Sequence, residues 1–371
     1  MPSIPDPRFR GFALSSRPVL ALDLGGTQIR AAVVQPDGSR LTRVATETPS
    51  ELGPAAVVDA CAATLVSARE GAPAEVRESI MGIGISSPGP VDPRAGAVVE
   101  PPNLGPDFRD VPLADAVQAA LGLPTFLDRD TNVAALGEAA YGAGRGQYDF
   151  IYVTVSTGIG GSIVTDGRLF HGPDGMAGEL GHVPVQLDGP ICGCGGRGHL
   201  EAVASGTALA REARQAVTSG SSPFLTARAG EIGLAELSAR DVAEGDDAGD
   251  AACEVVMGRA RRAVATACVG FVNAFNPHRI IIGGAIAEAQ GERMLGLAQD
   301  TIERECFSRL AAAVRVVPPE LGEDVSLAGA QPLVSSRIND PAWRRNGPAI
   351  RPSFASPGSD MSVHASGFGG A

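Results

Sequence analysis

The sequence predicts an α/β fold of two related lobes, and three observations lead to that prediction. Short runs of β-branched and other apolar residues alternate with Ala-rich runs of helical length, as in α/β proteins. Residues 20–39 and 150–170 share one pattern, namely an apolar strand, a Gly-rich turn, a second strand and an Asp-Gly turn. The chain has 371 residues, of which 44% are hydrophobic and 19% are charged, so it can bury a large core.

The elements of the first half follow from this alternation. Apolar runs predict strands, and Ala-rich runs of helical periodicity predict helices. Strands are expected at 19–23, 29–34, 41–46, 80–86 and 125–127, and helices at 55–69, 113–121 and 131–141.

The second half begins with the repeated strand pair at 150–170 and is richer in helix. Ala-rich helices are expected at 200–217 and 251–273, with a polar, Gly-containing connection from 218 to 249 between them. A strand at 279–282 ends in Gly283-Gly284, and a helix that carries 287–297 follows it.

Both ends of the chain lack hydrophobic periodicity and are expected to be flexible tails. Residues 1–16 contain three prolines, and residues 338–371 are rich in Gly, Pro and Ser. Trp343, the only tryptophan, falls in the second tail. A mobile segment is expected there, and docking of Trp343 on the body of the protein is the alternative.

The composition excludes several classes of function. The formal net charge is −12, and all 30 basic residues are arginines. Without lysine there is no Schiff-base chemistry, no Walker-type phosphate loop and no protein-kinase strand lysine. The acidic balance argues against nucleic-acid binding, and no apolar run is long enough for a membrane span or a signal peptide. Six scattered cysteines do not resemble a secreted disulfide framework, so a cytoplasmic location is expected.

Two Gly-rich turns are candidate phosphate sites. The runs Asp23 to Thr27 and Thr157 to Gly161 each follow one strand and precede another. Glycines let a backbone approach a ligand closely, and successive N–H groups can hold an anion. Neither turn matches the dinucleotide-binding pattern, which requires a following helix. Each turn alone is more typical of an ordinary tight turn, but two at matching places, with Gly283-Gly284 after a third strand, favour a bound nucleotide.

Four residues, His182, Cys192, Cys194 and His199, have the spacing of a metal site. They lie in a Gly-rich loop that has no core of its own, so a metal would give the loop a fixed shape. Two thiolates and two imidazoles favour zinc. The alternatives are a loop without metal and a Cys192–Cys194 disulfide. The other four cysteines fall in predicted helices and are expected to be small core residues.

A series of motifs occurs in the order found in one family. They are LDLGGTQIRAAVV, SSPGPVD, PNL, DRDTNVAALGE, TVSTGIGGSIV, GMAGELGH, CGCGGRGHLEAVASG and RIIIGGAIAEA. Over about residues 18–337 the chain resembles the ROK family of sugar kinases and related repressors. The resemblance implies the two-lobed fold of hexokinase, actin and heat-shock ATPases, with a deep cleft in which the lobes close on ATP, Mg²⁺ and a sugar. It implies a small lobe at 17–127, to which a last helix at 326–337 returns, and a large lobe at 128–325 with the zinc loop at 182–199.

The resemblance also implies roles for individual residues. Asp130 stands at the catalytic position and would accept the proton of the sugar hydroxyl, although in isolation it is typical of a helix N-cap. Asp23 would orient Mg²⁺ through water. The sugar would be bound by Asn103, Asp130, Glu179, His182 and Glu201, and ATP by Asp23, Gly25, Gly26, Thr27, Thr157, Gly158, Gly160, Gly161, Gly283 and Gly284. Structural zinc would fix the loop between Glu179 and Glu201 and thereby the sugar pocket.

Three positions depart from the family pattern. Arg129 stands where many members have Asn, so the sugar contact of that Asn is not assigned to it, and an ion pair with Asp128 or another acid is expected. His199 replaces a Cys of the zinc set, and Gln28 replaces a residue that is often basic. The remaining histidines match no motif and are given no role; they are His171, His278 and His364.

The expected function is ATP-dependent phosphorylation of a hexose, with D-glucose as the first choice. The alternatives are fructose, mannose, allose, N-acetylglucosamine or N-acetylmannosamine as substrate, polyphosphate as donor, and a non-catalytic sugar sensor. A DNA-binding repressor is disfavoured because only about 16 residues precede the first strand, too few for a helix-turn-helix module. The family implies a homodimer or homotetramer.

Overall fold

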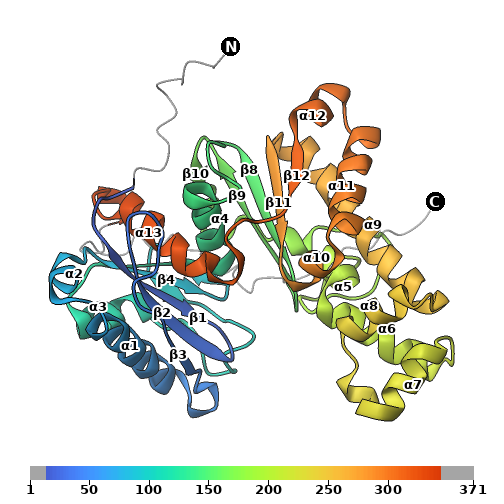
Figure 1. Cartoon of the computed structure of the whole chain (residues 1–371), viewed down its shortest axis with the longest axis horizontal. Helices are drawn as coiled ribbons and strands as arrows, with labels where there is room; N and C mark the ends of the chain where they lie inside the picture. The colour runs from blue at the N-terminus through green and yellow to red at the C-terminus, as the bar shows by residue number, and fades with distance from the viewer. Residues whose placement is uncertain (1–13, 344–371) are drawn as a thin grey trace, which may run out of the picture.

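The computed structural model describes residues 14–343, whose main strands form two mixed five-stranded sheets in separate lobes (Figure 1). The strand orders are β3-β2-β1-β4-β7 in the small lobe and β10-β9-β8-β11-β12 in the large lobe. In each sheet three antiparallel strands lead into two parallel pairs. The matching orders confirm the predicted α/β fold of two duplicated lobes.

Helices cover both faces of the small-lobe sheet. Leu20 and Leu22 of β1 pack on one face with α1, whereas Val19 and Ala21 pack on the other face with α13, because successive strand residues point to opposite sides. The strands are β1 (Val19–Leu24), β2 (Gln28–Val34), β3 (Val44–Glu47), β4 (Ile83–Ser87), β5 (Val91–Asp92), β6 (Ala97–Val98) and β7 (Thr125–Arg129). The helices are η1 (Ser50–Leu52), α1 (Pro54–Glu70), α2 (Ala74–Ser79), α3 (Leu113–Leu121) and the returning α13 (Val325–Arg337).

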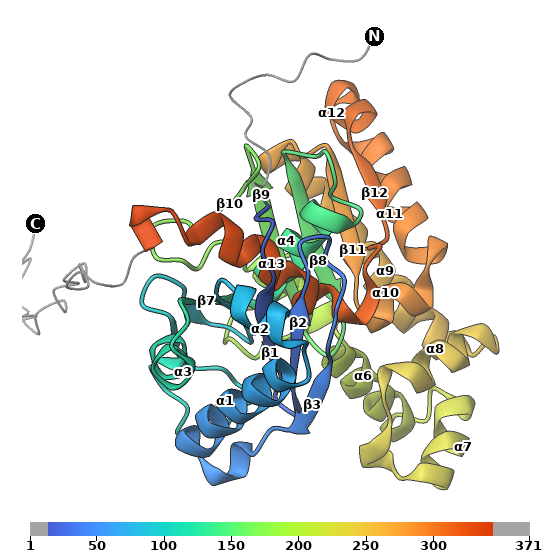
Figure 2. The same ribbon diagram turned by 60° about the vertical axis from the view of Figure 1, so that its left-hand side comes forward.

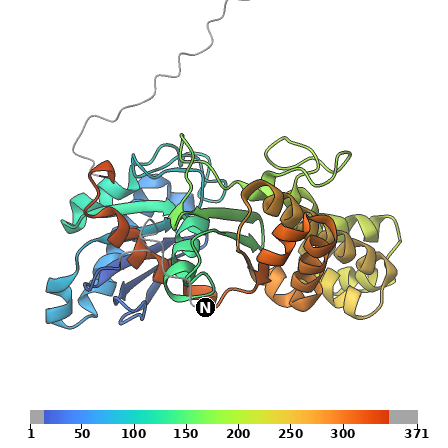
Figure 3. The same ribbon diagram turned by 90° about the horizontal axis from the view of Figure 1, so that it is seen from above.

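The large-lobe sheet also divides its residues between two faces. Ile151 and Val153 of β8 pack against the helices that gather on the outer side of the lobe (Figure 3), and Phe150 and Tyr152 pack on the α4 side. The strands are β8 (Phe150–Val155), β9 (Ile159–Thr165), β10 (Arg168–Leu169), β11 (Arg279–Gly283) and β12 (Arg315–Val317). The helices are η2 (Leu180–His182), α5 (Leu200–Ala204), α6 (Gly206–Thr218), α7 (Pro223–Ile232), η3 (Leu234–Glu236), α8 (Ala239–Asp247), α9 (Ala251–Phe275), α10 (Ala285–Gln290), α11 (Glu292–Glu305), α12 (Ser308–Ala313) and η4 (Gly322–Asp324).

Helix α4 (Asp130–Tyr141) lies between the two lobes (Figure 2). It packs on β8 and β9 and also on α13. A Cβ atom at Gly329 would lie 1.9 Å from the Val133 carbonyl oxygen, and one at Gly137 would lie 2.7 Å from that of Val325. Only glycines allow α4 and α13 to approach so closely. This contact joins α13, which covers one face of the small-lobe sheet, to α4, which packs on the large-lobe sheet.

Two predicted helices are each divided into two. The helix expected at 200–217 breaks at Ser205, whose side chain accepts a hydrogen bond from the Ala208 N–H and caps α6. The helix expected to carry 287–297 breaks at Gly291, where a φ of 48° places the backbone in the left-handed region. In both cases a capping residue inside an apolar pattern ends one helix and starts the next.

The polar connection predicted for 218–249 is wrong, because most of that segment is helical. Helix α7 begins at Pro223, after the N-cap Ser222, and α8 begins with a capping box formed by Ser238 and Asp241. The short elements β5, β6, β10, β12, α2 and α12 are also absent from the prediction.

The predicted tails fall only partly within the described residues. Residues 1–13 and 344–371 lie outside them, but Ser15 donates its N–H to Ser335 Oγ on α13. Trp343 ends a short 3-10 helix, η5 (Pro341–Trp343), and its ring lies 3.7 Å from the Arg337 guanidinium carbon. The expected mobility of Trp343 is therefore corrected, because a cation–π contact docks it on α13. None of the described helices has the length and apolar character needed to cross a bilayer.

Candidate functional site

The first residue of α4, Asp130, stands at the carboxyl end of the small-lobe sheet. Strand β7 runs parallel to β4, and Asp130 follows its last residue and accepts a hydrogen bond from the Thr131 N–H at 2.6 Å. The carboxyl is reached by solvent, but the protein atoms around it desolvate it enough to raise its pKa from 3.8 to about 6. Thr131 and Arg129 act to lower this pKa, and the carboxylates of Asp23 and Glu179 act to raise it.

A buried polar network lies directly behind Asp130. Asp128 accepts a hydrogen bond from Asn132 Nδ2 at 2.7 Å, contacts His171 Nε2 at 2.8 Å and forms an ion pair with Arg337. Burial alone would raise the pKa of Asp128, but Arg337 and His171 outweigh it and hold the pKa well below 3.8. The network joins β7, α4, α13 and the loop after β10. Neither His171 nor Arg337 belongs to a recognisable motif, so the sequence carried no signal for them.

The first Gly-rich turn packs against a predicted sugar residue. The Gly25 N–H donates to the Gln28 carbonyl at 2.9 Å, so it closes the turn and is not available to a phosphate. A Cβ at Gly26 would lie 2.8 Å from the Asn103 carbonyl oxygen, so only glycine admits Asn103 there. Asp23, just before the turn, accepts hydrogen bonds from Ser86 Oγ and from Arg30.

The second Gly-rich turn has the same relation to another predicted sugar residue. The Ile159 N–H donates to Glu201 Oε2 at 2.9 Å, and a Cβ at Gly158 would lie 2.8 Å from that oxygen. Gly284, at the end of β11, has a φ of 92°, and a Cβ there would lie 2.6 Å from the Val155 carbonyl oxygen. The backbone after β11 therefore lies against the end of β8, the strand that leads into the second turn.

Arg129 finds its expected acidic partner in Glu179, and not in the Asp128 side chain. Its guanidinium forms an ion pair with Glu179, which comes just before η2 in the large lobe. The Arg129 side chain is 9% exposed and that of Glu179 is 42% exposed. The ion pair holds Glu179 close enough to Asp130 for the Glu179 carboxylate to raise the pKa of Asp130.

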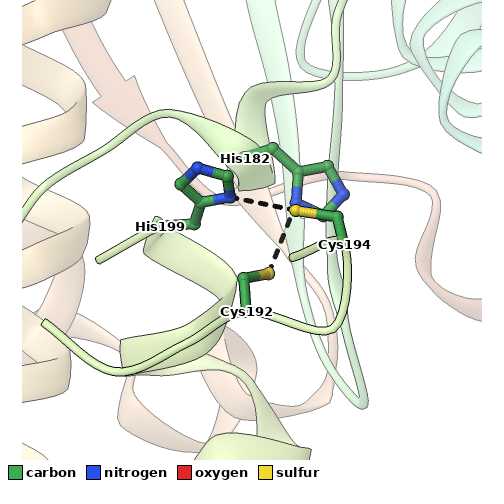
Figure 4. A group of neighbouring side chains, drawn as sticks. All are labelled: His182, Cys192, Cys194 and His199. Atoms are coloured by element: carbon green, nitrogen blue, oxygen red, sulfur yellow. Dashed lines mark hydrogen bonds between the residues drawn. The ribbon is translucent and has the colours of Figure 1, made fainter. Parts of the chain in front are cut away.

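The four predicted metal ligands converge on one point (Figure 4). Their donor atoms all lie within 4.8 Å of one another, with Cys192 Sγ 3.6 Å from His182 Nδ1 and Cys194 Sγ 3.2 Å from His199 Nδ1. Two sulfur and two nitrogen donors at these separations fit a tetrahedral zinc ion. Cys192 Sγ also lies 3.9 Å from Glu201 Oε1, so the donor cluster adjoins the second Gly-rich turn.

The ROK family model matches residues 19–337, which include both lobes and every candidate residue above. This chain belongs to the ROK family. Its match to the glucokinase of Thermotoga maritima is 36% identical and covers 86% of this chain and 98% of that relative. The glucokinase of Halalkalibacterium halodurans is 33% identical over 88% of this chain and 97% of its own length.

Solved ROK structures share the fold of this chain. The ROK hexokinase of Thermus thermophilus has a TM-score of 0.73 at 33% identity, with 86% of this chain and 99% of that chain covered. The ROK glucokinase of Streptomyces griseus, solved with glucose and AMPPNP, has a TM-score of 0.67 at 32% identity, with 85% and 98% covered. These similarities confirm the hexokinase-like fold that the sequence predicts.

The candidate site of this ROK chain is distinct from a cavity on the small lobe. A cavity of about 710 Å³ lies between α3, the start of β7 and Trp343, and none of the candidate site residues lines it. The candidate residues instead gather where the carboxyl ends of β1 and β7 face the large lobe. In α/β proteins, that edge is where ligands bind.

Proposed function

We propose that this ROK chain transfers the γ-phosphoryl group of ATP to D-glucose and forms glucose 6-phosphate. The observation that carries the proposal is the position of Asp130, a carboxylate with a raised pKa at the edge where both Gly-rich turns and the acids Glu179 and Glu201 meet. The similarity to bacterial glucokinases over nearly the whole described chain supports glucose as the substrate.

Asp130 acts as the general base. With a pKa of about 6 it is ionised at neutral pH and still basic enough to accept the proton of a hydroxyl as the phosphoryl bond forms. ATP lies along the second turn and Gly283-Gly284, and Asp23 faces the phosphates. Mg²⁺ that arrives with ATP neutralises phosphate charge, and in a chain without lysine this takes the place of a lysine contact.

The sugar is held by Asn103, Glu179, His182 and Glu201. Charged acceptors discriminate among polyols, because an epimer would leave a carboxylate that the bound sugar covers without its hydrogen bond. Zinc bound to His182, Cys192, Cys194 and His199 fixes the loop that presents these groups and takes no part in the transfer. The thiolates it requires support a cytoplasmic location, and the family supports a homodimer or homotetramer.

A panel of hexoses in a coupled assay tests the substrate. The highest kcat/KM is expected for glucose with ATP. N-acetylmannosamine is the competing substrate, since the N-acetylmannosamine kinase of Shigella flexneri is 31% identical over 74% of this chain. A kcat/KM for N-acetylmannosamine or fructose above that for glucose would reject the choice, and turnover with polyphosphate alone would reject ATP as the sole donor.

A further inference from the structure

The side chain of Arg129 lies in a narrow space between backbone segments that accommodates a guanidinium. Its residue is buried at the end of β7, and two glycines line its side chain. A Cβ at Gly89 would lie 2.9 Å from Arg129 Cδ, and a Cβ at Gly178 would lie 2.8 Å from Arg129 Nη2. Gly178 also has a φ of 92°, which disfavours any side chain. The backbone on both sides thus leaves room for this guanidinium.

The guanidinium donates to acceptors on α4 and in the large lobe. Nε donates to Thr131 Oγ1 at 3.1 Å, and Nη2 donates to the carbonyl oxygens of Gly161 at 2.9 Å and Ala177 at 3.0 Å. These three acceptors are uncharged and hold the plane of the guanidinium in one orientation. Nη1 then points at the Glu179 carboxylate and donates to Oε1.

Glu179 has little else to hold its side chain. It follows Gly178, its side chain is 42% exposed, and Arg129 is the partner that the structure gives its carboxylate. An exposed glutamate without such a partner samples several rotamers, and ordering it costs free energy when the sugar binds. With Oε1 held by Arg129, Oε2 is the oxygen left to accept a hydrogen bond from a hydroxyl.

We propose that Arg129 is a positioning residue of the sugar pocket, which fixes Glu179 in its hydroxyl-accepting geometry before the sugar arrives. This inference rests on the proposed placement of Glu179 in the sugar site. Arg129 does not replace the Asn that many family members carry at its position, because its guanidinium acts through the acid opposite. The pocket therefore offers the sugar one oxygen of a neutralised ion pair in place of an amide.

The same guanidinium also acts on the base beside it. The charged groups that face Asp130 are Arg129, Asp23 and Glu179, and of these only Arg129 favours the ionised carboxylate. Loss of the positive charge at position 129 therefore moves the acid limb of the pH–rate profile to higher pH. A substitution that keeps the positive charge but removes the planar guanidinium leaves the acid limb at its wild-type pH. The two roles can be separated with one pair of variants.

The test compares Arg129→Gln with Arg129→Lys. Arg129→Gln should raise the KM for glucose about tenfold to a hundredfold and shift the acid limb of kcat/KM upward by about one pH unit, with the KM for ATP unchanged. Arg129→Lys keeps the charge but cannot reach all the acceptors, so it should restore the acid limb and leave the KM for glucose high. Arg261→Gln is the matched control, because Arg261 pairs with Asp246 on the far side of the large lobe.

A double-mutant cycle with Glu179→Gln tests whether Arg129 acts through Glu179. Non-additive effects on kcat/KM are expected, and additive effects would overturn the inference, as would an unchanged KM for glucose in folded Arg129→Gln. If Arg129→Gln does not fold, Arg129→Lys takes its place in the cycle. If the wild type turns over no hexose, the proposed function fails, and calorimetric glucose binding to the same variants still decides the role of Arg129. Binding that is equal in wild type and variants, or absent in both, would reject that role.

Discussion

The two lobes repeat one sheet order but place different chemistry at the strand ends that face the site. In the small lobe, β1 carries Asp23 and β7 leads into Asp130, so its edge is acidic. In the large lobe, β8 carries Thr154 at the place that matches Asp23, and β11, which matches β4, ends in Gly283. The small lobe thus supplies charges that can move a proton or orient a cation, and the large lobe supplies backbone that can approach phosphates closely.

The lobes also differ in how their site residues are held. The acids of the small lobe are fixed by side chains of the same sheet or of α13, as in the Asp23–Arg30 and Asp128–Arg337 pairs. The loop of the large lobe that we propose to bind the sugar has few such partners, and its contacts are the four-donor cluster and Arg129, which comes from the other lobe. The two lobes therefore share one sheet order, although different contacts hold their site residues in place.

Asp130→Asn gives the largest expected effect and tests the acidic side of this contrast. Loss of the base should lower kcat by about a thousandfold, within the range for general-base catalysis, and change the KM for glucose much less. A coupled assay of ADP release measures it, and Asp300→Asn, an exposed acid on α11, is the control. Turnover within threefold of the wild type would remove Asp130 from the mechanism.

Removal of zinc tests the dependence of the large-lobe loop on its donor cluster. Protein purified without chelator should contain about one zinc per chain. Chelation or Cys192→Ser should raise the KM for glucose roughly tenfold to a hundredfold and lower the melting temperature, because the loop between Glu179 and Glu201 loses its fixed shape. Cys306→Ser, outside the cluster, should leave both quantities unchanged. Less than half an equivalent of metal would contradict the site.

The pH dependence of kcat/KM tests whether Asp130, at the edge of the small-lobe sheet, is the base. Since desolvation by the surrounding protein atoms and the neighbouring acids raise the pKa of Asp130 to about 6, the base is ionised above that pH and protonated below it. Below about pH 6, kcat/KM should therefore fall close to tenfold per pH unit. The residual activity of Asp130→Asn should lack this limb, and an acid limb retained in that variant would assign it to another group.

Gly284→Ala tests the backbone approach in the large lobe. The new Cβ would lie 2.6 Å from the Val155 carbonyl oxygen in a left-handed conformation, so the end of β8, which leads into the second turn, must shift. The KM for ATP is expected to rise about tenfold while the KM for glucose stays near that of the wild type. Gly220→Ala has similar positive φ but open space around its Cβ, so it separates backbone strain from displacement of the turn. An equal rise in the KM for ATP in both variants would attribute the effect to backbone strain and not to displacement of the turn.

Trp343→Ala should give the smallest effect and concerns stability alone. Loss of its contact with Arg337 is expected to lower the free energy of unfolding by about 1–2 kcal/mol without changing kcat. Denaturant unfolding measures it against Leu52→Ala, which removes an exposed side chain. A large loss of kcat would instead connect Trp343 to the site through Asp128.

The sequence was sufficient for the parts of the fold that repeat or follow local patterns. The paired strands, their Gly-rich turns and the Cys/His spacing are local, and the structure places them as predicted. The helices at 223–232 and 239–247 were missed because a polar composition concealed them, although Ser222-Pro223 and the Ser238–Asp241 capping box were available as signals.

The partners within the site were not available from the sequence. Arg129 and Glu179 are 50 residues apart and lie in different lobes, and Arg337 is 209 residues from Asp128. Such pairs depend on how the lobes are joined by α4 and α13, and no local pattern encodes that. The departure from Asn at position 129 was visible, but its partner was not.

The return of α13 to the small lobe also has a consequence during synthesis on the ribosome. The sheet of that lobe is complete once β7 has emerged, but one apolar face, with Val19, Ala21 and Phe126, lacks the cover of α13 until residues 325–337 follow nearly two hundred residues later. At about 5–20 residues per second, this delay is about 10–40 s. A chaperone that binds nascent apolar surface has that interval in which to act, and a chain cut short before α13 leaves that part of the face exposed.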